Sequence, residues 1–101
     1  MDMRALMKQA QQMQKQMQET QEQLAQREVT AEVAGGQVVA VMNGRHQLVS
    51  LTIRPETVDP QDVEFLQDLV IGAVNEAVRR TDEMVEKEMG AVTGGLKLPG
   101  M

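Results

Sequence analysis

The first quarter of the chain carries a narrow stripe of apolar residues that repeats every seven positions. Two adjacent rows make up the stripe: Met3, Ala10, Met17 and Leu24 in one, and Leu6 and Met13 in the other. Neither Gly nor Pro interrupts residues 2–28, in which Gln, Glu, Lys, Arg and Met, all good helix formers, predominate. The heptad spacing predicts a long helix over residues 2–28, with Asp2 as its N-cap and a seam as narrow as that of a coiled coil.

The pattern changes at residue 29 to the two-residue alternation of strands with one buried face. Val29–Val33 alternates apolar and polar side chains, and similar runs follow Gly35-Gly36 and Asn43-Gly44. Gly-Gly and Asn-Gly between such runs are strong signals for tight hairpin turns. Residues 29–53 are therefore predicted to form a three-stranded antiparallel meander.

Two-residue turns would also fix which side chains share a face of this sheet. The first turn pairs Val33 with Val38, and the second pairs Val38 with Val49. This register leaves a small apolar cluster on the otherwise polar face, made up of Val39, Val41 and Leu48. Since an exposed apolar cluster needs cover, we expect these three residues at an interface between two chains.

A wide apolar stripe between residues 60 and 89 predicts a second long helix, with Asp59 as its N-cap and Pro60 in its first turn. The stripe is broad in the first two thirds of the segment, which is expected to pack on the sheet, and thins afterwards. Gly90 is expected to end the helix. Residues 91–101 are predicted to be a flexible tail.

Together these elements predict a single α+β domain over residues 1–90, in which both helices are longer than the sheet. A six-residue strand is ~20 Å long, whereas the two helices would be ~40 and ~45 Å long. The sheet therefore covers only about half of either helix, and the rest needs a partner. We expect a homodimer with protruding helical arms, in which Met13 and Met17 of the narrow seam join the interface. A monomer with frayed helix ends is the alternative.

Composition excludes several classes of protein. The 101 residues include no Cys, Trp or Tyr and a single Phe, and the net charge is −5. Without Cys there is no disulfide framework, zinc ribbon or thiol nucleophile. The missing aromatic residues exclude the stacking platforms that usually bind single-stranded nucleic acid. No secretory signal or apolar run of ~20 residues is visible, so we expect a cytoplasmic protein without a membrane partner.

The chain offers little for catalysis. His46 and Ser50 are the only His and the only Ser, and they lie on one predicted strand without a placed acid. No glycine pattern matches a phosphate-binding loop or a dinucleotide fingerprint. The carboxylates between Asp82 and Glu88 suit a solvated helix face better than a cation site. We therefore expect no catalytic residue, metal, cofactor or small-molecule substrate.

Charge is distributed unevenly along the chain. Residues 1–54 contain six basic and five acidic residues, whereas residues 55–101 contain four and ten. On the first helix, Arg4, Lys8 and Lys15 share the face opposite the apolar seam, and Arg79-Arg80 adds a basic spot on the second helix. Lys and Arg are the usual contacts to DNA phosphates. These five residues are the candidates for DNA binding, with an ordinary solvated helix face as the alternative.

The segment Leu6–Gln14, LMKQAQQMQ, resembles the N-terminal signature of the YbaB/EbfC family of bacterial nucleoid-associated proteins. The resemblance continues through Ala34–Gly36, Val38–Gly44, the segment Asn75–Arg80 and Met89–Leu98. It implies a YbaB-like dimer with two helical arms around a central sheet. It also implies binding of double-stranded DNA, organisation of the bacterial chromosome in the nucleoid and effects on transcription, without enzymatic activity.

The resemblance supports only some of the candidate DNA-binding residues. Lys8 lies within the matched signature, and Arg79-Arg80 corresponds to the basic pair that follows the Asn-x-Ala segment in the family. Arg4 and Lys15 rest on helix-face geometry alone. We predict a homodimer that contacts duplex DNA mainly through backbone phosphates. The alternative is a prefoldin-like holdase or a structural coiled-coil interaction protein, which the Met-rich first helix would also suit.

Overall fold

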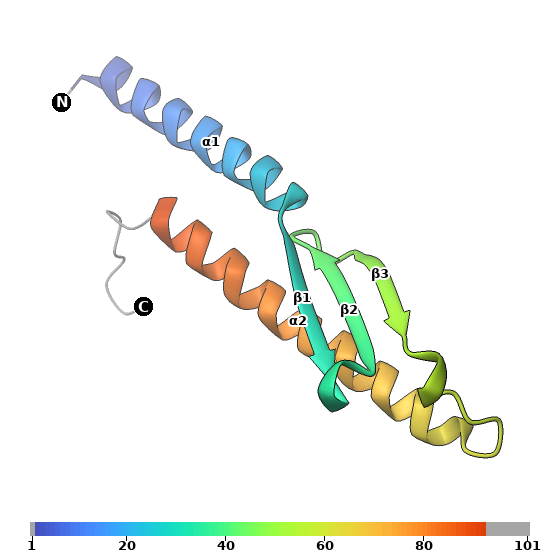
Figure 1. The fold of residues 1–101 in the computed structure, drawn as a ribbon. Helices are drawn as coiled ribbons and strands as arrows, with labels where there is room; N and C mark the ends of the chain where they lie inside the picture. The colour runs from blue at the N-terminus through green and yellow to red at the C-terminus, as the bar shows by residue number, and fades with distance from the viewer. Residues whose placement is uncertain (1, 93–101) are drawn as a thin grey trace, which may run out of the picture.

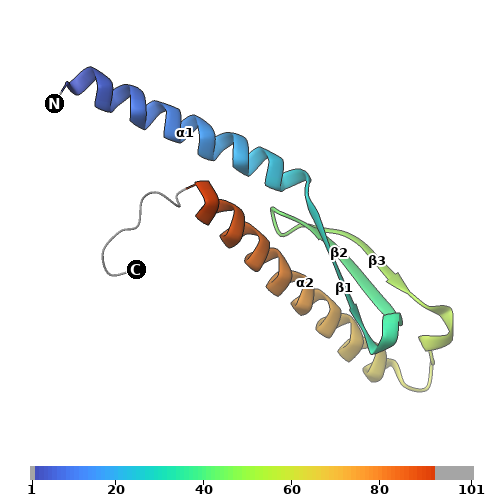
Figure 2. The same ribbon diagram turned by 60° about the vertical axis from the view of Figure 1, so that its left-hand side comes forward.

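A computed structural model of the protein describes residues 2–92. The elements in chain order are α1 (Met3–Gln26), β1 (Glu28–Val33), η1 (Ala34–Gly36), β2 (Val38–Asn43), β3 (Leu48–Ile53), η2 (Pro55–Thr57) and α2 (Val63–Val92). The sheet packs on the first part of α2, while α1 and the C-terminal part of α2 extend to the same side of the sheet (Figures 1 and 2). The predicted α+β class and order of elements are confirmed.

Helix α1 begins as predicted and ends slightly earlier. The Asp2 carboxylate accepts a hydrogen bond from the backbone N–H of Arg4 at 3.0 Å, which makes Asp2 the N-cap. At the other end Arg27 has an extended backbone, and β1 begins at Glu28. Leu24 is the buried residue of α1, at 4% exposure. The helix is therefore an arm that is attached to the rest of the domain near its C-terminal end.

The first hairpin has the predicted register. The sheet is antiparallel in the order β1-β2-β3, and Val33 pairs with Val38. Four residues connect the strands, with positive φ at three consecutive positions, Ala34, Gly35 and Gly36. Two of these positions are glycines, which adopt this backbone without strain.

The predicted register of the second hairpin is wrong. Val38 pairs with Ile53, not with Val49, because the connection is longer than two residues and includes His46 in a left-handed conformation at φ 61°. A bulge in β3 follows, since Val41 pairs with Ser50 while Met42 pairs with Leu48. Leu48 therefore lies opposite a core residue and is not in register with the half-buried Val39 and Val41.

The core lies between the sheet and α2. Its buried residues are Ala31, Val38, Ala40, Met42, Ala73 and Ala77. Four of these six are alanines, so the helix and the sheet backbone approach each other closely. Helix α2 packs against β1 and β2, whereas β3 has only one residue, Ile53, that is not classed as exposed. The third strand therefore offers apolar side chains that nothing in the described part of the chain covers.

The second long helix is displaced toward the C-terminus relative to the prediction. Asp59 accepts a hydrogen bond from the N–H of Gln61 in a turn that precedes the helix. The cap is Asp62, whose carboxylate accepts from the N–H of Phe65 at 3.2 Å. The expected stop at Gly90 is also wrong, because α2 continues to Val92. The rest of the predicted tail, residues 93–101, lies outside the described residues.

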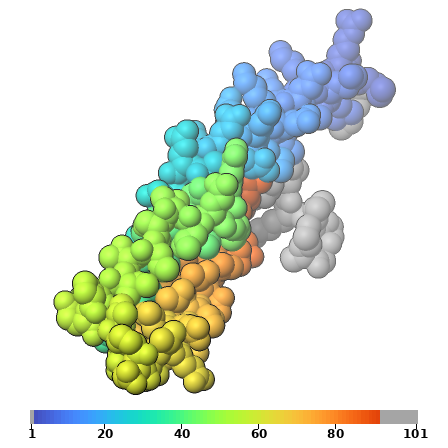
Figure 3. Space-filling view, turned by 90° about the vertical axis from the view of Figure 1, so that its right-hand side faces the viewer, coloured from blue at the N-terminus to red at the C-terminus, as the bar shows by residue number. Residues whose placement is uncertain are grey.

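The molecule is strongly elongated. It measures 71 × 28 × 17 Å, and its radius of gyration is 19.6 Å, against about 13 Å for a compact chain of this length. Figure 3 shows α1 at one end of the molecule and the start of α2 at the other. Neither of the two described helices combines the length and the apolar character that crossing a membrane would require.

Candidate nucleic-acid interface

Three basic residues form a stripe along the α1 arm, which we call the α1 basic stripe: Arg4, Lys8 and Lys15. All three are exposed. At 3.6 residues per turn they fall within about 40° of one another around the helix axis, and they span ~16 Å along it. The apolar seam that ends in the buried Leu24 lies on the other side of the helix.

The charges of the α1 basic stripe are available to a ligand. Within residues 2–92, none of its three side chains forms an ion pair; the cationic groups that do are those of Arg27, His46, Arg79 and Arg80. Gln11 and Gln18 are exposed on the same face of the helix. Such a face can meet a row of phosphates with Lys and Arg and add hydrogen bonds from Gln.

The side chain of Arg79, in contrast, is bound by carboxylates of its own helix. Its Nη2 and Nε atoms lie 2.6 and 3.0 Å from the two carboxylate oxygens of Glu76, and its Nη1 lies 2.5 Å from Glu83. Hydrogen bonds from Arg79, and then from Arg80, lower the pKa of Glu76 from 4.5 to about 2. The same pairing raises the pKa of Arg79 above its ordinary value.

Arg80 links α2 to the sheet. Its Nε atom lies 3.0 Å from Glu76, and its Nη1 donates to the carbonyl oxygen of Thr30 at 2.7 Å. Thr30 belongs to β1, an edge strand, so Arg80 satisfies an acceptor at the open edge of the sheet. Together with Glu76, Arg79 and Glu83 it forms a group with no net charge.

The five basic residues predicted for DNA binding therefore divide into two sets. Arg4, Lys8 and Lys15 lie together on the exposed arm, whereas Arg79 and Arg80 are bound by acidic partners on α2, and Arg80 also contacts β1. The sequence contains a signal for this pairing, because Glu76 and Glu83 stand three and four residues from the arginines. The distribution of charge along the chain does not by itself reveal this pairing.

The residues predicted for a chain–chain interface are only partly exposed. Met13, Met17, Val39 and Val41 are half-buried within the single chain, and Leu48 is exposed. Other exposed apolar side chains lie on β3 and on α2 and the segment that leads into it: Val49, Leu51, Val58, Val63, Phe65 and Ile71. The sequence did not indicate this second group as an interface, because Val63 and Ile71 belong to the apolar stripe that was expected to pack on the sheet.

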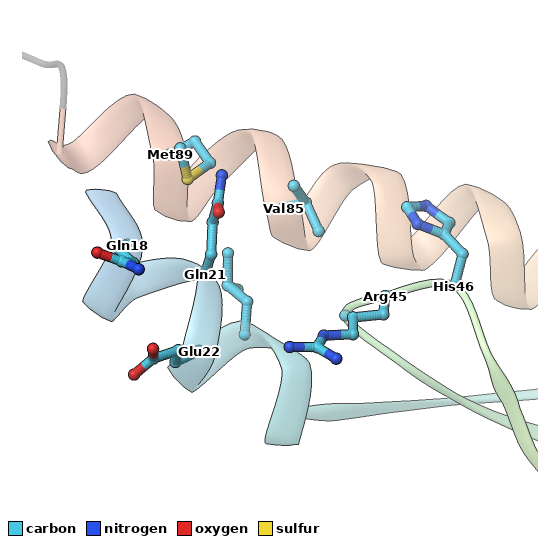
Figure 4. Close-up of a pocket in the computed structure, with 9 residues that line it drawn as sticks. Gln18, Gln21, Glu22, Arg45, His46, Val85 and Met89 are labelled. Carbon is cyan, nitrogen blue, oxygen red and sulfur yellow. The ribbon is translucent and has the colours of Figure 1, made fainter. Parts of the chain in front are cut away.

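A wide cavity of about 510 Å³ opens between α1, the turn before β3 and α2 (Figure 4). His46 lies at its edge, with Nε2 2.6 Å from the Asp82 carboxylate of α2. This contact gives His46 a structural partner on another element. Within residues 2–92, no three His, Asp or Glu side chains come together as a metal-binding group.

Comparison with known proteins identifies the family. The YbaB/EbfC DNA-binding family matches residues 1–96. Nucleoid-associated proteins of Alkaliphilus metalliredigens and Pelotomaculum thermopropionicum are 51% and 48% identical, each over 99% of this chain and over 88% and 95% of their own lengths. The crystal structure of the uncharacterized protein HP0035 from Helicobacter pylori shares the fold, with a TM-score of 0.74 and 25% identity over 86% of this chain and 91% of that chain. The chain therefore belongs to the YbaB/EbfC DNA-binding family.

Proposed function

We propose that the protein binds double-stranded DNA as a homodimer, in which the α1 basic stripe of each chain contacts backbone phosphates. The observation that carries this proposal is a row of cations on an exposed arm of an otherwise acidic chain, which form no ion pair with any residue of the described range 2–92. Membership of a DNA-binding family and relatives named nucleoid-associated proteins support it. We further propose that the protein acts in the nucleoid, where it organises DNA and affects transcription.

Arg79 and Arg80 have a different role in this proposal. Their guanidinium groups are already bound to Glu76, Glu83 and a backbone carbonyl. A phosphate would have to displace these partners, so we propose that the two arginines contribute little to DNA binding and that Arg80 instead holds α2 to the sheet. The family is a DNA-binding family and not an enzyme family, and we propose no catalytic residue, cofactor or metal for this chain.

Contacts limited to phosphates make binding sensitive to salt and tolerant of sequence. Three contacts on each arm give six in a homodimer. At about −0.9 per contact, the logarithm of the binding constant should fall with the logarithm of salt concentration with a slope of about −5. Duplexes of different sequence should bind with similar affinity, because phosphate contacts carry no direct base information.

The Lys15→Gln variant tests the assignment to the arm. Gln is already frequent on α1, so the helix should be preserved. In the homodimer the variant loses two phosphate contacts, and its salt slope should fall in magnitude by about 2. Fluorescence polarisation with a labelled duplex at several salt concentrations measures this slope.

Lys87→Gln is the matched control, because Lys87 is an exposed lysine of α2 that forms no ion pair within residues 2–92. Its slope should equal that of the unchanged protein. Equal effects of the two variants would show that only net charge matters and would contradict the proposed stripe. Suppression of a client protein's aggregation without affinity for duplex DNA would favour a holdase instead.

A further inference from the structure

The turn between β2 and β3 caps the end of the arm. The backbone N–H of Gly44 points at two carbonyl oxygens of the chain where α1 ends, those of Leu24 and Arg27, each at 3.1 Å. Carbonyl groups in the last turn of a helix lack partners within the helix. The Leu24 carbonyl accepts from the N–H of Arg27 at 3.1 Å, and the turn from the sheet adds a second donor that ties the end of α1 directly to the sheet backbone.

This contact requires glycine for reasons of space. A Cβ atom on Gly44 would overlap the carbonyl oxygen of Leu24, and it would lie 2.6 Å from the carbonyl carbon and 3.1 Å from Leu24 Cβ. Two of these three neighbours belong to the backbone and cannot turn away. Any larger residue at position 44 must therefore move α1 relative to the sheet.

The turn that carries Gly44 is itself held in place. The Asn43 side chain accepts hydrogen bonds from the N–H groups of Arg45 and Gln47 at 2.9 and 3.1 Å. The next contact anchors the turn to α2, since His46 Nε2 lies 2.6 Å from the Asp82 carboxylate. The turn is thus fixed both to the sheet and to α2, and Figure 4 shows His46 beside that helix.

Other contacts within residues 2–92 also restrain the arm, since Leu24 is buried at 4% exposure and Met13 and Met17 are half-buried. Beyond the turn, the cavity of about 510 Å³ separates the facing sides of α1 and α2. One ion pair bridges the end of the arm and α2, with Arg27 Nη1 2.6 Å from Glu88, and both side chains are well exposed. An exposed pair of this kind is weak. The backbone contact at Gly44 is stronger in one respect, because it joins the end of α1 directly to the backbone of the turn and leaves no space for a side chain.

We propose that Gly44 and the turn Asn43–Gln47 act as a clamp that sets the angle of α1, and that this angle positions the α1 basic stripe for duplex DNA. This role of the angle in DNA binding rests on the proposed function. Lys8 lies 16 residues beyond Leu24, or ~24 Å along the helix. A tilt of about 10° at the clamp would move Lys8 by ~4 Å, which exceeds the ~3.4 Å of helix axis that separates successive phosphates of one strand. When two arms bind one duplex, their basic side chains would then no longer lie opposite its phosphates.

The test compares Gly44→Ala with Gly90→Ala. A Cβ at Gly90 of α2 meets no atom within 4 Å, so this control adds the same methyl group without a clash. Because the chain has no Cys, spin labels on Gln12→Cys and Glu86→Cys report the α1–α2 distance in the full chain, diluted with unlabelled protein. Sedimentation and circular dichroism check assembly and helix content.

We expect Gly44→Ala to shift the α1–α2 distance by several ångströms and to weaken duplex binding about tenfold, with assembly unchanged; Gly90→Ala should change neither. An unchanged distance in Gly44→Ala would overturn the clamp. A shifted distance with unchanged affinity would overturn its role in binding. If the unchanged protein fails to bind a duplex, the proposed function fails, and the distance measurement still decides the clamp.

A milder variant keeps the proposal testable if Gly44→Ala does not fold. Asp82→Asn removes the charge that anchors His46 and leaves the core intact. The control is Asp68→Asn, which removes the same charge at an exposed position of α2. Compared with this control, we expect Asp82→Asn to show a broader distribution of α1–α2 distances and to bind duplex DNA two to three times more weakly. Identical distributions in the two variants would overturn the clamp.

Discussion

At the scale of single residues, the same residue type has different roles in different surroundings. Lys8 and Lys15 have exposed side chains on the arm that form no ion pair in the described part of the chain, whereas Arg79 shares the carboxylate of Glu76 with Arg80. The stripe could be predicted from the helical period, because it needs only the spacing along α1. The neutralisation of Arg79 and Arg80 depends on side-chain geometry and on the Thr30 carbonyl of another element, which spacing alone does not give.

The lowered pKa of Glu76 leads to a prediction about pH. A carboxyl group whose pKa falls on folding stabilises the native state above its unfolded pKa and loses this effect as the pH falls through its folded pKa. For Glu76 the window runs from about pH 4.5 to about 2. The difference in free energy of unfolding between the unchanged protein and Glu76→Gln should be constant above pH 5 and should shrink below pH 4.5.

Urea unfolding at a series of pH values measures this difference. Glu86→Gln is the control, since Glu86 is exposed on the same helix and forms no ion pair within residues 2–92. A difference for Glu76→Gln that stays constant down to pH 3 would mean that the two arginines do not stabilise the ionised carboxylate.

At the scale of elements, turns decide which sequence predictions succeed. The first hairpin has the predicted register, with Val33 opposite Val38. The second does not, because the Asn43 side chain and the left-handed His46 make a longer turn than Asn-Gly suggests. The start of α2 was misplaced for a similar reason: Asp59 and Asp62 are both good caps, and only the latter accepts from the third residue of the helix.

The close packing of α2 on the sheet predicts sensitivity to larger side chains. Ala77 is fully buried between the helix and the strands. Ala77→Leu should therefore lower the free energy of unfolding by about 1–3 kcal/mol, because the extra methyl groups have no space. The same substitution at the exposed Ala5 of α1 should change it by less than about 0.5 kcal/mol. Chemical denaturation measures the free energy of unfolding of both variants. Equal losses in the two variants would contradict the close packing of α2 on the sheet.

At the scale of the whole molecule, an elongated chain with an uncovered third strand suits a dimer. Leu51 of β3 is 37% exposed, and Phe65 and Ile71 of α2 are 47% and 57% exposed. We propose that the second chain covers these residues, with Leu48 and the predicted seam residues of α1 at the margin. The helix lengths alone are enough to predict from the sequence that a partner chain is needed. The location of the interface could not be predicted, because it depends on the register of β3 and on which strands α2 covers.

Ile71→Asp should therefore dissociate the homodimer, because a charge in an apolar interface is costly to bury. Sedimentation equilibrium should give the mass of one chain for this variant. Met7→Asp, at another exposed apolar position but on the arm, should keep the mass of two chains. Dissociation by Met7→Asp and not by Ile71→Asp would place the interface on the arms instead.

The central claim is that α1 carries the DNA contacts. The most direct measurement is the salt slope of duplex binding for the triple variant Arg4→Gln/Lys8→Gln/Lys15→Gln beside Arg79→Gln. We predict that the slope falls from about −5 to near zero in the triple variant and is retained in Arg79→Gln. A slope that persists in the triple variant and falls in Arg79→Gln would contradict the claim and would place the phosphate contacts on α2.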